Sequence, residues 1–192
     1  MKRISLLLAF SIAMLLPAFG QDPSAARSLK IDDEFVHQQF GKEFTFLPEF
    51  TPVVGDLDGD GVEDVVIAAR CKNPMLDQGE HNYTVMDPYN NFFGYGDPRM
   101  TTTFSEGDPT NRGLVMLVID GEGKNAWHSA TPKAKYVIVN LPYKTISVKK
   151  MRMRKRNIEA IYIEEAGEMG GSSALFFDGR KFRYVPMGGD MQ

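Results

Sequence analysis

The chain has 192 residues, of which 43% are hydrophobic and 24% are charged, and its formal net charge is −3. This length and composition are ordinary for a globular protein with one hydrophobic core, and they leave little room for two domains. The single cysteine, Cys71, excludes an intramolecular disulfide. The acidic balance makes the protein a poor general binder of nucleic acid or anionic lipid.

The N-terminus carries the pattern of a secretory signal peptide. Lys2 and Arg3 precede an apolar run over residues 4–16, and small residues then lead to Gly20. This order of charged, apolar and small residues is typical of a cleaved export signal, and the run is shorter than the ~20 residues that a spanning helix needs. We therefore predict that residues 1–20 are a signal peptide and that the mature protein is secreted or periplasmic.

The mature chain, residues 21–192, has a net charge of −5, because the signal removes two basic residues and no acidic one. No later run is apolar for long enough to span a bilayer. Its first predicted element is a helix over residues 31–39. Acidic residues at its start suit the positive end of the helix dipole, and Phe35, Val36 and Phe40 form an apolar stripe.

Alternation of apolar and polar residues predicts strands along most of the remaining chain. Asp178-Gly179 predicts a tight hairpin turn, and we expect further turns at residues 120–123 and 155–157. We predict a mainly β domain, α+β at the margin, with an antiparallel sheet, roll or sandwich and an N-terminal helix. The predicted strands cover residues 52–54, 65–69, 114–119, 136–141, 146–153, 158–163, 174–177 and 181–185.

Residues 72–113 lack clear periodicity and are predicted to form a long irregular loop. The segment is rich in Gly, Pro and Asn and contains the aromatic residues Tyr89, Phe92, Phe93 and Tyr95. Loops this long are commonly either functional or disordered, and aromatic residues argue against disorder. Two interpretations stay open: a cover for the sheet or a platform that binds a ligand.

Acidic residues at alternate positions follow the first predicted strand. Ca²⁺ takes six to eight oxygen ligands, and carboxylates spaced in this way in a tight loop can converge on one ion. Closely spaced carboxylates repel one another when no cation is bound, whereas a solvated acidic turn has no need of this spacing. We therefore predict a Ca²⁺ site with five ligands: the carboxylates of Asp56, Asp58, Asp60 and Asp64 and the backbone carbonyl of Val62.

The acidic loop differs from an EF-hand, which has a glutamate at its twelfth position and then a helix. Here the twelfth residue is Ile67, within a β-branched strand. Residues 50–70 instead resemble an FG-GAP or VCBS-type repeat, the Ca²⁺-binding hairpin of integrin-α-like propellers. Residues 172–183 resemble the tail of small exported bacterial proteins with one such repeat. The resemblance implies the same five Ca²⁺ ligands and no catalytic residue, and one repeat excludes a closed propeller of four to eight blades.

Enzyme signatures are largely absent from the sequence, which has no G-x-S-x-G, H-E-x-x-H or phosphate-binding glycine loop. A basic strand at residues 149–156 places Lys150 and Arg152 on one face and Met151 on the other. This face is interpreted as solvated, with a patch for an anionic surface as the alternative.

We predict an exported, non-catalytic Ca²⁺-binding β module that binds or supports a protein or polysaccharide partner at the cell envelope. The alternative is a hydrolase of envelope or extracellular polymers with its site beneath residues 72–113.

Overall fold

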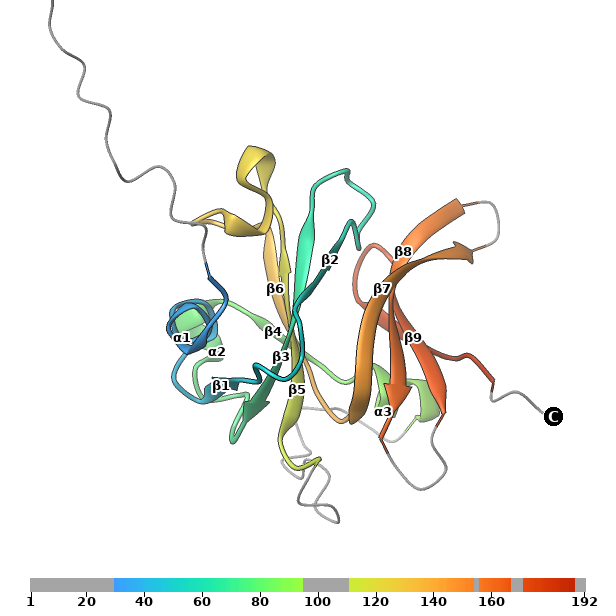
Figure 1. Ribbon diagram of the computed structural model, residues 1–192, viewed down its shortest axis with the longest axis horizontal. Coiled ribbons are helices and arrows are strands. Elements are labelled where there is room, and N and C mark those ends of the chain that lie inside the picture. The colour runs from blue at the N-terminus through green and yellow to red at the C-terminus, as the bar shows by residue number, and fades with distance from the viewer. Residues whose placement is uncertain (1–29, 95–110, 154–155, 167–170, 189–192) are drawn as a thin grey trace, which may run out of the picture.

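The computed structural model describes residues 30–94, 111–153, 156–166 and 171–188, and this part of the chain is mainly β. Two sheets pack face to face, and a helix covers the outer side of the first sheet (Figure 1). The described residues form no closed propeller. The prediction of a mainly β fold is therefore confirmed.

The first sheet contains six strands in the described residues, ordered β1-β3-β5-β6-β4, with β2 paired to β3. All pairs are antiparallel except β4 with β6. Its strands are β1 (Phe44–Phe46), β2 (Val53–Gly55), β3 (Asp64–Cys71), β4 (Thr84–Met86), β5 (Leu114–Asp120) and β6 (Ala134–Ile138).

The register of β3 positions the acidic loop. Gly55 pairs with Asp64, so residues 56–63 connect β2 and β3 at one end of the sheet. On the other side of β3, Val65 pairs with Ile119, which brings the last residue of β5 to the same end.

The second sheet is an antiparallel meander in the order β10-β9-β8-β7. The predicted hairpin is confirmed, because Phe177 pairs with Phe182, but its connection is the four residues 178–181 rather than Asp178-Gly179 alone. A second hairpin joins β7 to β8, with Met153 paired to Arg156. The strands are β7 (Tyr143–Met153), β8 (Arg156–Glu165), β9 (Ser172–Phe177) and β10 (Phe182–Pro186).

Helix α1 (Asp33–Phe40) begins at Asp32, whose side chain accepts a hydrogen bond from the backbone of Phe35. The predicted apolar stripe is buried: Phe35, Val36 and Phe40 pack on the outer face of the first sheet. A second cluster fills the space between the sheets. Both faces of β3 are therefore buried, which explains its continuous apolar sequence.

The segment over residues 72–113 contains more regular structure than expected. Its described part holds α2 (Gln78–His81), β4 and α3 (Pro88–Phe93). Asp87 caps α3 by accepting a hydrogen bond from the backbone of Asn90, and Pro88 occupies the first turn. Tyr95 lies outside the described residues.

Other expectations compare with the structure as follows. The expected tight turn at residues 120–123 is wrong, since a 3₁₀ helix, η2 (Gly123–His128), lies between β5 and β6.

The predicted signal, residues 1–20, lies outside the described residues. Within the described residues, no helix has the length and apolar character that crossing a membrane requires. On β7, Lys150 and Arg152 are exposed while Met151 is buried, as both interpretations of this face require.

Candidate metal centre

The loop between β2 and β3 is folded by its own carboxylates. Asp56 Oδ1 accepts a hydrogen bond from the Gly59 amide at 2.8 Å, and its Oδ2 accepts one from the Gly61 amide at 3.0 Å. Both glycines have positive φ, at +83° and +86°, which other residues adopt only with strain. The glycines therefore allow the sharp turns that gather the acidic side chains at one point.

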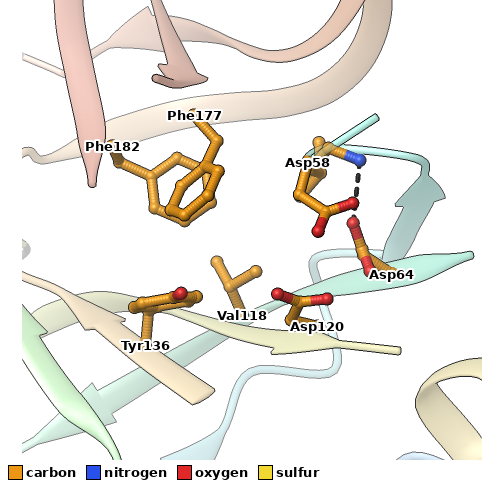
Figure 2. Close-up of a pocket in the computed structure, with 8 residues that line it drawn as sticks. Asp58, Asp64, Val118, Asp120, Tyr136, Phe177 and Phe182 are labelled. Carbon is orange, nitrogen blue, oxygen red and sulfur yellow. Dashed lines mark hydrogen bonds between the residues drawn. The ribbon is translucent and has the colours of Figure 1, made fainter. Parts of the chain in front are cut away.

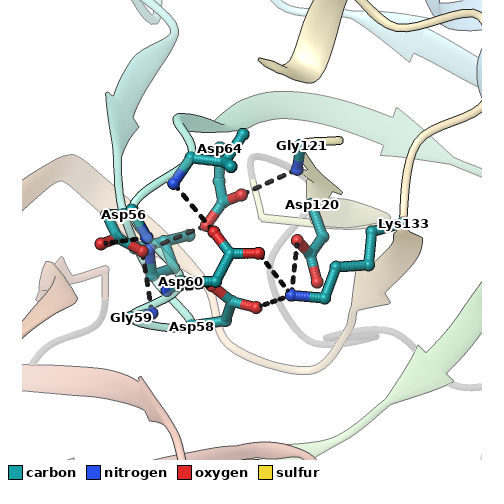
Figure 3. A network of polar contacts seen from close by, with 11 residues as sticks. Asp56, Asp58, Gly59, Asp60, Asp64, Asp120, Gly121 and Lys133 are labelled. Carbon is teal, nitrogen blue, oxygen red and sulfur yellow. Dashed lines mark hydrogen bonds and ion pairs between the residues drawn. The ribbon is translucent and has the colours of Figure 1, made fainter. Parts of the chain in front are cut away.

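Two further aspartates repeat this arrangement. Asp58 Oδ1 accepts a hydrogen bond from the Asp60 amide at 3.0 Å, and Asp60 Oδ1 accepts one from the Val62 amide at 2.8 Å. In each of these two side chains, Oδ1 accepts a hydrogen bond from a loop amide and Oδ2 faces Lys133 (Figure 3).

Asp64 closes the loop from the start of β3 and is only 1% exposed. Its Oδ2 accepts a hydrogen bond from the Leu57 amide and its Oδ1 accepts one from the Gly121 amide, both at 2.8 Å. Burial raises the pKa of this carboxyl to about 6, with the nearby loop aspartates adding to the effect. Asp64 therefore connects the loop to the end of β5 while remaining among the acidic side chains.

The structure brings four of the predicted ligands into one acidic cluster. Carboxylate oxygens of Asp56, Asp58 and Asp64 lie within 4.8 Å of one another, and so do those of Asp58, Asp60 and Asp120. These groups could hold a metal ion. The fifth predicted ligand, the carbonyl of Val62, stays a prediction.

Asp120 is a member of the cluster that sequence reasoning missed. It is the last residue of β5, is 5% exposed, and reaches the loop because β5 pairs with β3. Burial raises its pKa to about 7, with further contributions from Asp64 and Asp58. The only signal in the sequence is an acidic residue at the end of an apolar strand, and that residue joins the loop only once the strand pairing is known.

Lys133 is the second residue that was missed. Its ammonium group pairs with Asp58 Oδ2, with Asp60 Oδ2 at 2.6 Å and with Asp120 Oδ1 at 3.9 Å (Figure 3). The hydrogen bond from Lys133 lowers the pKa of Asp60, and the two loop carboxylates raise the pKa of Lys133 above its ordinary value. Its backbone amide donates to the Asp120 carbonyl at 3.0 Å, which fixes the base of the side chain next to the cluster.

The loop also contacts the second sheet, because the Asp56 amide donates to Glu159 Oε2 of β8 at 2.8 Å. A small hollow opens between the sheets beside the cluster, with the acidic side chains at one end and aromatic rings along its walls (Figure 2). Among the residues that the structure describes, none of those lining the hollow comes from 72–94 or 111–113. The lining residues are Leu57, Asp58, Asp64, Val118, Asp120, Tyr136, Phe177 and Phe182.

All side-chain donors in the two acidic groups are carboxylate oxygens, which suit hard cations such as Ca²⁺ or Mg²⁺ rather than copper or zinc. The one cysteine is not part of them. Cys71 is buried at the end of β3, and burial raises the pKa of its thiol to about 12, so it stays protonated and unreactive.

Comparison of the chain with protein-family models, with curated proteins and with solved structures finds no match. The resemblance of residues 50–70 to FG-GAP and VCBS-type repeats therefore stays a prediction that rests on those residues. What the described residues establish is a mainly β fold of two sheets, with acidic groups at the β2–β3 hairpin that could hold a metal ion.

Proposed function

We propose that the protein is an exported, non-catalytic Ca²⁺-binding β module with one FG-GAP-like repeat, which serves a binding or structural role at the cell envelope. The observation that carries this proposal is the pair of acidic groups at the β2–β3 hairpin, with their ligand oxygens within 4.8 Å.

Ca²⁺ is the cation that best suits this loop. The cluster offers several carboxylates on a glycine-rich turn, and Ca²⁺ accepts many oxygen ligands in flexible geometry. Mg²⁺ demands a near-ideal octahedron and keeps several of its waters, so a dedicated cage of side chains suits it less well.

A cation at this position supports a structural role. The loop is joined to β5 through Asp64 and Gly121 and to β8 through Asp56 and Glu159. Charge that is left unbalanced in the loop weakens both connections, because the carboxylates repel one another. Ca²⁺ would therefore stabilise the junction of the two sheets, and a partner protein or polysaccharide would bind the folded module.

The hydrolase alternative gains no support from the hollow beside the cluster. Its site was expected beneath residues 72–113, and the hollow is lined from the two sheets and the acidic loop instead. Tyr89 of α3 packs against Tyr184 with ring centres 5.2 Å apart, which favours a covering role for this part of the segment.

The test is thermal unfolding of the mature protein in chelator and in Ca²⁺. Extracellular modules bind Ca²⁺ with dissociation constants of about 10⁻⁴–10⁻³ M. Ca²⁺ at ten times that constant adds about 1.4 kcal/mol, which raises the melting temperature of a chain this long by about 3–6 °C. Asp58→Ala should abolish the increase, while Asp178→Ala, in the β9–β10 turn, should keep it. Identical melting curves with and without Ca²⁺ would refute the proposal.

A further inference from the structure

One buried oxygen at the edge of the acidic loop has no hydrogen-bond partner. Within the described residues only two buried side-chain atoms lack one, Asp120 Oδ1 and Ser173 Oγ. A buried carboxylate oxygen without a donor is costly, so its retention calls for an explanation. Asp120 Oδ1 lies 3.9 Å from the Lys133 ammonium, which is too far for a hydrogen bond.

The oxygens that Lys133 holds are the ones that the loop backbone leaves free. The Oδ1 atoms of Asp58 and Asp60 accept hydrogen bonds from loop amides, and their Oδ2 atoms accept them from Lys133. A lysine ammonium is a compact charge with three donors on a flexible stem, so it can fill a small oxygen cage without fitting it completely.

From this geometry we infer that Asp120 is a further metal ligand and that Lys133 is an internal competitor for the same site. The inference rests on the proposed Ca²⁺ function. A divalent ion that joins Asp58, Asp60 and Asp120 needs the oxygens that face Lys133, so the ion and the ammonium exclude each other. The ion would also give Asp120 Oδ1 a direct ligand contact, in place of the 3.9 Å ion pair with Lys133 that is too long for a hydrogen bond.

The exchange would move one side chain and little else. The Lys133 backbone amide stays bonded to the Asp120 carbonyl, while the side chain, already 39% exposed, turns towards solvent. The apparent affinity for Ca²⁺ equals the intrinsic affinity multiplied by the fraction of molecules in which Lys133 does not occupy the site. Lys133 would therefore set the Ca²⁺ concentration at which the module fills, and bound Ca²⁺ would present a new positive charge beside the loop.

The first test is calorimetric titration of Ca²⁺ into the mature protein and its variants. Lys133→Met should bind Ca²⁺ about tenfold more tightly, because the competitor is gone. Asp120→Asn should bind about tenfold more weakly, because affinity follows the charge of the ligand set. The controls are Lys124→Met, at an exposed lysine of η2, and Asp87→Asn, at a buried aspartate that caps α3. Neither control should shift the affinity by more than about twofold.

A second test needs no variant and so does not depend on how a variant folds. Amine-labelling of the wild-type protein, read by mass spectrometry, should modify Lys133 faster in Ca²⁺ than in chelator, with Lys124 as the unchanged internal reference. Absence of any Ca²⁺ binding by the wild type would refute the proposed function. Ca²⁺ binding with unchanged labelling of Lys133, or with equal or weaker binding by Lys133→Met, would overturn this inference alone.

Discussion

The carboxylate of Asp64 accepts a hydrogen bond at 2.8 Å from the amide of Gly121, 57 residues further along the chain. Gly121 lies close to its surroundings, since a Cβ atom there would stand 2.4 Å from the Glu63 carbonyl oxygen. The Asp64 side chain therefore joins the acidic loop directly to the backbone at the end of β5. Loop and strand are therefore expected to respond to substitution as one unit.

Asp64→Ala should lower the free energy of unfolding by about 2–4 kcal/mol in chelator, because it leaves the buried amides of Leu57 and Gly121 without an acceptor. Asp64→Asn keeps the volume and one acceptor oxygen, so its loss should be about half as large. Urea denaturation of the two variants measures the difference. A loss below about 0.5 kcal/mol for Asp64→Ala would contradict a structural role for this carboxylate.

The stability of the metal-free protein should depend on pH through Asp120. Burial raises its pKa to about 7, against 3.8 for an exposed aspartate. Between about pH 4 and pH 7 the folded state keeps a proton that the unfolded state has lost, so the free energy of unfolding falls as the pH rises. An asparagine at position 120 does not titrate. In chelator, the free energy of unfolding of the wild type should therefore fall relative to that of Asp120→Asn as the pH rises through this range.

Excess Ca²⁺ provides the control for the pH experiment. A bound cation favours ionised carboxylates, so the decline of wild type relative to Asp120→Asn should shrink or reverse. A difference between the two proteins that stays constant from pH 4 to pH 8 in chelator would show that Asp120 ionises as an exposed residue does.

Tyr89 and Phe92 separate the two interpretations of α3. Tyr89 is partly buried against the inter-sheet cluster, with its ring 4.9 Å from that of Phe93, whereas Phe92 is 51% exposed. Tyr89→Ala should cost about 2–3 kcal/mol as a cover residue, and Phe92→Ala about 1 kcal/mol or less. Denaturant unfolding of both variants decides the matter, and near-neutral effects in both would favour a ligand platform.

Processing of the native protein tests the export prediction. The mature chain should begin at Gln21 and lie outside the cytoplasm, because the charged, apolar and small segments of residues 1–20 have the order of a signal peptide. Intact-mass measurement of the protein from fractionated cells gives the start directly. Recovery of residues 1–20 in the folded protein would overturn both the signal and the location.

Local patterns in the sequence were enough to predict much of the fold and the acidic loop. The alternating carboxylates lie within nine residues, and Asp178-Gly179 signals the hairpin whose connection contains both residues. Asp120 and Lys133 could not be found in the same way, because only the pairing of β5 with β3 and β6 carries them to the loop. The start of α3, by contrast, does have a local signal in the sequence. Asp87 followed by Pro88 is typical of a helix start, but the surrounding turn-rich sequence obscured it.

Because both faces of β3 are buried, this strand cannot be fully packed until the strands of the second sheet have been synthesised. Val66 and Ala68 face the inter-sheet cluster, whose other half comes from residues 143–186. Synthesis releases β3 from the ribosome well before those residues exist, so its inner face must wait for distant partners, and contacts of such long sequence separation form slowly. A chain interrupted before Tyr143 would present this sheet as an open apolar surface, and its expected fate is aggregation or proteolysis rather than a smaller folded module.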